Sequence, residues 1–62
     1  NVTVDGRNII VTDADGRMVS VANAAGMMLY NATGAQRTIV PVGLPGVYVV
    51  AVGESVFKVV VR

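Results

Sequence analysis

Short runs of apolar residues, most of them valine, alternate with glycine-containing polar stretches along the whole chain. β-Branched residues favour strands because their stiff side chains pack well on a pleated surface. The glycines recur at a spacing close to the roughly 8–12 residues that one strand and its turn occupy in a small all-β domain. We therefore expect an all-β fold, a small sandwich whose seven short strands are Val2–Val4, Asn8–Thr12, Met18–Ala22, Met27–Tyr30, Thr38–Val42, Val47–Val52 and Ser55–Val61.

The turn residues predict how neighbouring strands are joined. Asp5-Gly6 and Asp15-Gly16 can adopt the positive φ angles of a two-residue hairpin turn, so they predict a meander of the first three strands. Gly53-Glu54 predicts a tight turn that pairs the last two strands as an antiparallel hairpin. Pro41 cannot donate a hydrogen bond to a ladder, so the fifth strand is predicted to lie at a sheet edge or to bend there.

Alternation within a strand predicts which side chains are buried, because successive residues point to opposite faces of a sheet. Val19 and Val21 are predicted to face the core from the third strand. Phe57, Val59 and Val61 are predicted to share one face of the last strand.

Two segments do not alternate clearly. Val47–Val52 is apolar at both parities, so we expect a central strand that is covered on both sides. Asn23–Ala32 contains good helix formers, but Gly26 in its middle opposes a helix, and we favour a strand over a short helical turn. We expect Met27-Met28-Leu29 to fill the core, and the alternative is an adaptable exposed surface.

Composition restricts the chemistry that the chain can perform. The chain has 62 residues, which is the length of a single domain, and 53% of them are apolar. There is no cysteine and no histidine, so thiolate nucleophiles, imidazole bases, disulfides and most zinc sites are excluded. The net charge of +1 gives no electrostatic reason to expect nucleic acid as a partner. We expect no enzymatic activity, no cofactor and no small-molecule substrate.

The remaining candidate sites are weak. Thr12–Gly16 resembles part of a calcium loop, but the bidentate glutamate that ends such a loop is missing, so we interpret the segment as a turn and expect no metal. Tyr30, Tyr48 and Phe57 are too few to form a platform for carbohydrate. We expect Tyr48 and Phe57 to pack between the sheets.

Three segments, in this order and spacing, resemble the type IX secretion sorting domains (type A) of secreted Bacteroidetes proteins. They are Met18–Tyr30, a valine-rich strand followed by a small turn with glycine; Leu44–Val50, which contains Gly-x-Tyr; and Glu54–Arg62, a strand with lysine, valines and arginine. The chain departs from the usual pattern at Ala22, where an aromatic residue is common, and at Met27, where a basic residue is common.

The resemblance implies an immunoglobulin-like sandwich that acts as a C-terminal sorting signal. Such a signal directs an upstream cargo through the periplasm and across the outer membrane to the cell surface or the medium. Its partners would be the secretion translocon and a sortase that removes the signal. By position, the residues that match the motifs recognised by this machinery are Gly26, Gly46, Tyr48, Lys58, Val59, Val60, Val61 and Arg62.

Other readings of the pattern stay open. The chain begins with Asn1, so we interpret residues 1–62 as one domain from a longer secreted protein. The main alternative to a sorting signal is an extracellular adhesive or carbohydrate-binding sandwich. A third is a pilin-like subunit completed by strand exchange, and the sheet edges also predict weak self-association.

Overall fold

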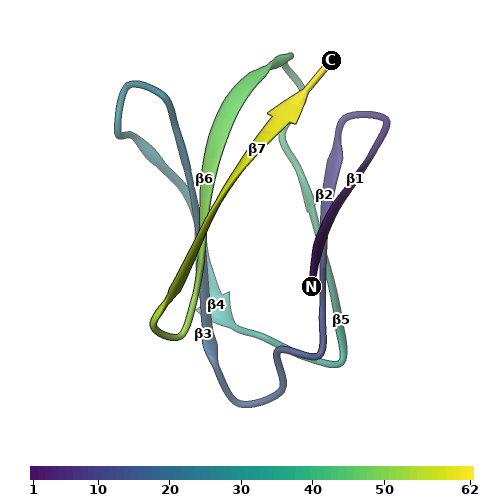
Figure 1. The fold of residues 1–62 in the computed structure, drawn as a ribbon, viewed down its shortest axis with the longest axis vertical. Helices are drawn as coiled ribbons and strands as arrows, with labels where there is room; N and C mark the ends of the chain where they lie inside the picture. The colour runs from purple at the N-terminus through teal and green to yellow at the C-terminus, as the bar shows by residue number, and fades with distance from the viewer.

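The structure, a computed structural model, describes residues 1–62 as seven strands without a helix. Two antiparallel sheets form two layers, one in the order β1-β2-β5 and the other in the order β4-β3-β6-β7 (Figure 1). The expected all-β sandwich is thereby confirmed. The chain contains no helix that is long and apolar enough to span a membrane. The strands are β1 (Val2–Asp5), β2 (Asn8–Thr12), β3 (Met18–Asn23), β4 (Met28–Thr33), β5 (Arg37–Pro41), β6 (Gly46–Val52) and β7 (Ser55–Val61).

The strand order is that of an immunoglobulin-like sandwich, except that the fourth strand joins the sheet of strands three, six and seven. In constant-type immunoglobulin domains the fourth strand extends the sheet that contains strands one, two and five. Here β4 pairs with β3, so the layers hold three and four strands.

A small core of ten residues fills the space between the two sheets. Val19 and Val21 point into it, as predicted. Phe57 shares the inner face of β7 with Val59 and Val61 but remains 39% exposed, because β7 is an edge strand that the opposite sheet covers only in part. The core residues are Ile9, Val11, Ala14, Val19, Val21, Val40, Tyr48, Val50, Val52 and Val61.

Two hairpins have two-residue loops with glycine in the first position. Gly6 and Gly53 have φ angles of 61° and 58°, which is the conformation that a type II′ turn requires at that position. The predicted β6–β7 hairpin is confirmed. In the β1–β2 hairpin the loop is Gly6-Arg7 rather than Asp5-Gly6, since Asp5 still pairs with Asn8.

The predicted meander of the first three strands is wrong. Asp15-Gly16 forms a turn in which the Arg17 N–H donates to the Ala14 carbonyl at 3.0 Å, but β2 and β3 lie in different sheets. The chain crosses between the layers at this point, and Ala14 is buried there. A hairpin would leave β2 and β3 in one sheet, so the buried faces of the two strands could not oppose each other across the core.

The predicted cover over both sides of β6 is also wrong. The strand is central, between β3 and β7, but only its inner face is buried. Val47 and Val49 on its outer face are 39% and 37% exposed. The sandwich has two layers, so the outer face of each sheet meets solvent.

The segment after β3 is a turn and a strand, which confirms the choice of strand over helix. The Asn23 Oδ1 atom accepts hydrogen bonds from the N–H groups of Ala25 and Met27, and β4 begins at Met28. The expectation that Met27-Met28-Leu29 fills the core is wrong, because all three residues are exposed. Met28 pairs with Ala22 and therefore lies on the outer face of the sheet.

Pro41 lies on an edge strand, as predicted. The Val42 N–H donates to the Arg7 carbonyl at 3.0 Å. In an antiparallel ladder this bond flanks a pair, here Pro41 and Asn8, whose own backbone groups point away from each other. The missing N–H of Pro41 therefore removes no hydrogen bond between β5 and β2. It does remove a donor from the free edge of β5, which makes that edge a poorer template for an added strand.

Candidate functional site

Most of the residues that match the family motifs come together at one end of the sandwich. Gly46 pairs with Val61 and Tyr48 pairs with Val59 across β6 and β7. Gly26 lies in the β3–β4 turn, which is at the same end of the sandwich but is separated from β7 by β6 (Figure 1). Thus the motif residues of β6 and β7 form one continuous region, and Gly26 lies apart from it.

Strand β7 divides these residues between two environments. Val61 is buried and Val59 is half-buried, so both contribute to the core. Lys58, Val60 and Arg62 are exposed. A partner could therefore touch the second group directly, whereas the first group can act only by holding the strand in place.

The free edge of β7 is defined by the hydrogen bonds on the other side of β6. The Gly53 N–H donates to the Met18 carbonyl at 2.9 Å. This bond flanks the pair Val19 and Val52, so the backbone groups of Val52 point away from β3 and toward β7.

Strict alternation then places the backbone groups of Phe57 and Val59 toward β6. The N–H and C=O groups of the alternate residues Val56, Lys58 and Val60 point away from β6. No strand lies beyond β7 in this sheet. β7 has seven residues and no proline, so it is a longer and more complete template for an added strand than β5. The outward-facing residues are Val56, Lys58 and Val60.

Tyr48 holds the loop that precedes β6. The side chain is buried, and its hydroxyl donates to the Leu44 carbonyl at 2.6 Å. The same kind of bond, from a tyrosine hydroxyl to a backbone group a few residues upstream, is found at the corner of immunoglobulin-like domains. Tyr48 is therefore a structural residue that positions the loop and the start of β6.

A hollow of about 270 Å³ lies between the β3–β4 turn and the β5–β6 loop. The polar side chains at its walls are already engaged, since Asn23 accepts from Ala25 and Met27 and Tyr48 donates to Leu44. This hollow can receive a small apolar group but presents no acid or base for catalysis. Its lining consists of Asn23, Ala24, Ala25, Leu44, Pro45, Gly46, Val47 and Tyr48.

The charged residues do not converge. No three acidic, histidine or cysteine side chains lie close enough together to hold a metal ion. The segment Thr12–Gly16, considered as part of a calcium loop, is the crossover between the sheets and buries Ala14. Asp5 ends β1 beside the first hairpin loop, and Glu54 is the second residue of the loop between β6 and β7.

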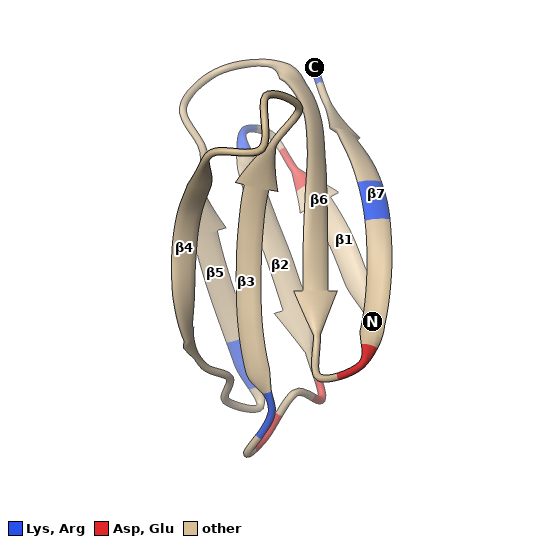
Figure 2. Ribbon diagram, turned by 90° about the vertical axis from the view of Figure 1, so that its left-hand side faces the viewer, with Lys and Arg blue, Asp and Glu red and all other residues tan.

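The sequence analysis missed an exposed apolar surface on the four-stranded sheet. Figure 2 shows this sheet in front, with Lys58 on β7 as the only charged position along the middle of its strands. The signal was present in Val47–Val52, whose apolar residues occupy both parities. The apolar residues that this outer face exposes are Met18, Met28, Val47, Val49, Val56 and Val60.

Comparison with known proteins gives no relative from which a function could be transferred. No family model matches the chain, and no curated protein or solved structure matches it significantly. The functional argument therefore rests on the residues and surfaces described above.

Proposed function

We propose that this domain is the C-terminal sorting signal of a secreted protein, which directs the cargo across the outer membrane and is recognised through the free edge of β7. The observation that carries the proposal is the outward direction of the backbone groups of Val56, Lys58 and Val60. The region that matches the sorting motifs contains this edge. The cargo would pass through the periplasm and reach the cell surface or the medium.

Recognition would proceed by strand addition. An extended segment of the translocon would pair with β7, and main-chain hydrogen bonds would supply affinity with little demand on sequence. Lys58 and Val60 would supply specificity, because both side chains project from the outer face beside the added strand. An acidic residue opposite Lys58 would add a favourable cross-strand pair.

The buried motif residues would act as positioning residues. Val59 and Val61 hold β7 against the core, and Gly46 and Tyr48 are their partners on β6. Gly46 has a φ of 153°, which favours glycine at the start of that strand. Loss of these residues would weaken export by loosening β7.

The two ends of the chain are separated in a way that suits a cargo. The α-amino group of Asn1 donates to the Thr12 carbonyl at 3.1 Å, at the end of β2. Figure 1 shows the C-terminus at the opposite end of the sandwich from the end of β2. A cargo joined at Asn1 would leave the end of β7 accessible to the translocon and to the sortase.

The test is export of a secreted reporter fused to residues 1–62 in a bacterium that has a type IX system. Lys58→Pro and Val60→Pro each remove one outward N–H and leave the N–H groups that face β6 in place. Both variants should accumulate in the periplasm. Normal export of both folded variants would overturn the proposal.

A matched control lies on the other sheet. The backbone N–H of Ile39 also points away from its neighbour β2, because Ile39 is two residues from Pro41 in the same ladder. Ile39→Pro should be exported normally if β7 is the recognised edge. Thermal unfolding of each variant would show that retention is not caused by loss of the fold. A chain ending at Phe57 should also be retained, but it lacks Val59 and Val61 and would lose stability as well.

The alternative of carbohydrate binding gains no support from the rings. Tyr48 is buried, Tyr30 is half-buried, and Phe57 lies on the inner face of β7. These side chains do not form an exposed aromatic platform on one face.

A further inference from the structure

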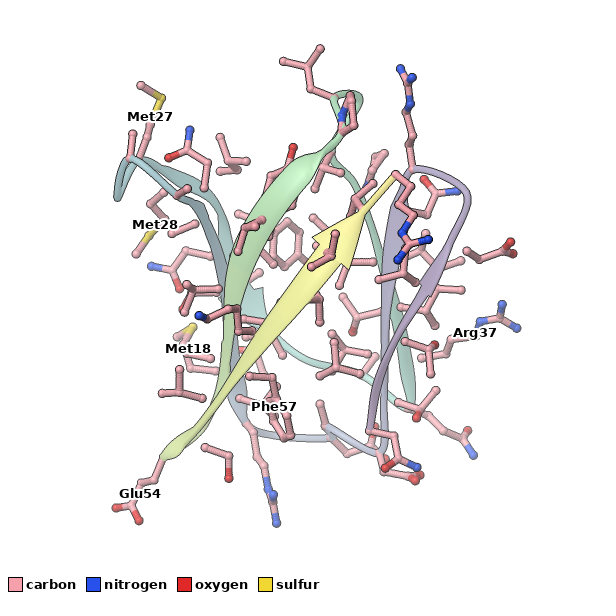
Figure 3. All side chains as sticks on the ribbon, turned by 45° about the horizontal axis from the view of Figure 1, so that its top comes forward. Met18, Met27, Met28, Arg37, Glu54 and Phe57 are labelled. Atoms are coloured by element: carbon pink, nitrogen blue, oxygen red, sulfur yellow. The ribbon has the colours of Figure 1, made fainter.

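Export through the β7 edge uses only Lys58 and Val60 from the outer face of the four-stranded sheet and leaves the rest of that face without a role. Six apolar side chains on it are between 37% and 68% exposed. They come from all four strands: Met18 from β3, Met28 from β4, Val47 and Val49 from β6, and Val56 and Val60 from β7. Figure 3 shows Met18 and Met28 projecting away from the three-stranded sheet. Exposed apolar patches of a few hundred Å² are often functional.

Small residues lie at the centre of this face. Ser20 pairs with Ala51, and Ala22 pairs with Val49, across the two central strands. Larger apolar side chains flank them, with Met18 at the start of β3, Met28 at the start of β4 and valines on β7, whereas Asn31 of β4 lies opposite Ser20. When two sheets pack face to face, side chains from the facing surfaces interdigitate, so small central positions can receive larger residues of an opposing sheet.

The charge of the face restricts the kind of partner. Lys58 is the only charged residue that the strand pairings place on it, and it lies on the edge strand β7. The aliphatic stem of a lysine can pack on apolar surface while the ammonium group stays in water. The face therefore offers little to a strongly charged partner, whereas another neutral apolar face can cover it without leaving a buried charge.

We propose that this face is a dimer interface, in which the four-stranded sheets of two copies of this chain pack against each other about a two-fold axis. Such an interface is isologous, since each copy contributes the same residues. The six apolar side chains expose on the order of 500 Å² per copy. The area buried by two copies is at the lower end of specific interfaces, so the dimer is weak and reversible.

Packing of two faces is more favourable than pairing of two β7 edges. Two β7 strands paired antiparallel about their middle would bring the Lys58 residues of both copies close together, and like charges on neighbouring strands are destabilising. The face-to-face arrangement keeps Lys58 at the rim and leaves the β7 edge free. The dimer therefore leaves exposed the backbone groups that the proposed sorting function uses, although it covers the side chain of Val60.

The test is sedimentation of the 62-residue chain over a concentration series that reaches the millimolar range. The unsubstituted chain should pass from monomer to dimer. Val49→Lys introduces a charge near the centre of the face and should give only monomer. Val60→Lys, at a more exposed position of the same face, repeats the test if Val49→Lys unfolds.

Ile39→Lys is the matched control. Ile39 is 51% exposed and lies on the opposite sheet, so its substitution should leave the dimer unchanged. Purely monomeric unsubstituted chain at the highest concentration would overturn the proposal. Loss of the dimer in Lys58→Pro with its retention in Val49→Lys would also overturn it, because that result indicates pairing of edges.

Discussion

At the scale of single residues, two positions hold loops in place against their neighbours. Tyr48 joins β6 to the preceding loop through its bond to Leu44. Gly34 lies against the crossover between the sheets, because a Cβ placed there would be 2.6 Å from the Ala14 carbonyl oxygen and 2.8 Å from Val19 Cγ2. The core of this domain is small, so each of these contacts is a large share of its stability.

Substitutions of Tyr48 should separate the contribution of the ring from that of the hydroxyl. Tyr48→Ala should lower the free energy of unfolding by about 3–5 kcal/mol, because it empties part of the core. Tyr48→Phe should lower it by about 1–2 kcal/mol, since only the hydrogen bond to Leu44 is lost. Urea unfolding followed by circular dichroism would measure both. A nearly neutral Tyr48→Ala would contradict the burial of the ring.

Gly34→Ala should be destabilising by about 1–3 kcal/mol, because the added methyl group would overlap the backbone of Ala14. The same unfolding measurement applies. Ala24→Ser, at an exposed position, serves as the control and should change little. Unchanged stability of Gly34→Ala would mean that the crossover does not pass this close to Gly34.

At the scale of elements, β7 combines a structural face with an open edge. Its register with β6 decides which residues enter the core, and a slip by one residue would exchange the two faces. Val61 and Val60 are neighbours of the same type with opposite environments, so they test this register directly.

Val61→Ala should lower the free energy of unfolding by about 2–3 kcal/mol, because Val61 is buried in the core. Val60→Ala should change it by less than about 0.5 kcal/mol, because Val60 is exposed. Comparison of their urea midpoints is sufficient. Equal effects, or a larger effect for Val60→Ala, would contradict the register.

Strand positions in this chain could be predicted from the sequence, whereas strand partners could not. The alternation around Val19 and Val21 and the glycine turns are local signals, so the seven strands were expected close to their observed bounds. Asp15-Gly16 forms the expected turn, but the same local geometry is compatible with a hairpin within one sheet and with a crossover to the other sheet. The choice depends on which layer β3 joins, and that follows from contacts distant in sequence.

The exposure of Met27-Met28-Leu29 also depends on contacts that are distant in sequence. Apolar character predicts burial on average, but Met28 lies opposite Ala22 on a face that no third layer covers. The candidate site was predictable only in part. The motif resemblance pointed to β7. The direction of its backbone groups could be inferred only from the hydrogen bond between Gly53 and Met18 in the structure.

At the scale of the whole molecule, the sandwich presents two surfaces with different physical character, which meet at the side chains of Lys58 and Val60. The β7 edge offers unpaired backbone groups, and the outer face of the four-stranded sheet offers apolar side chains. A dimer through the face would leave the backbone of Val56, Lys58 and Val60 exposed. Export and self-association can therefore be abolished separately, the first by proline on β7 and the second by lysine at Val49.

The account depends on β7 being an open edge, and amide hydrogen exchange of the 62-residue chain tests this most directly. The amides of Phe57 and Val59, which face β6, should be protected, and those of Val56, Lys58 and Val60 should exchange rapidly. This alternating pattern, read by NMR at low protein concentration, is the predicted result. Uniform protection along β7, or protection of Val56, Lys58 and Val60 alone, would contradict it.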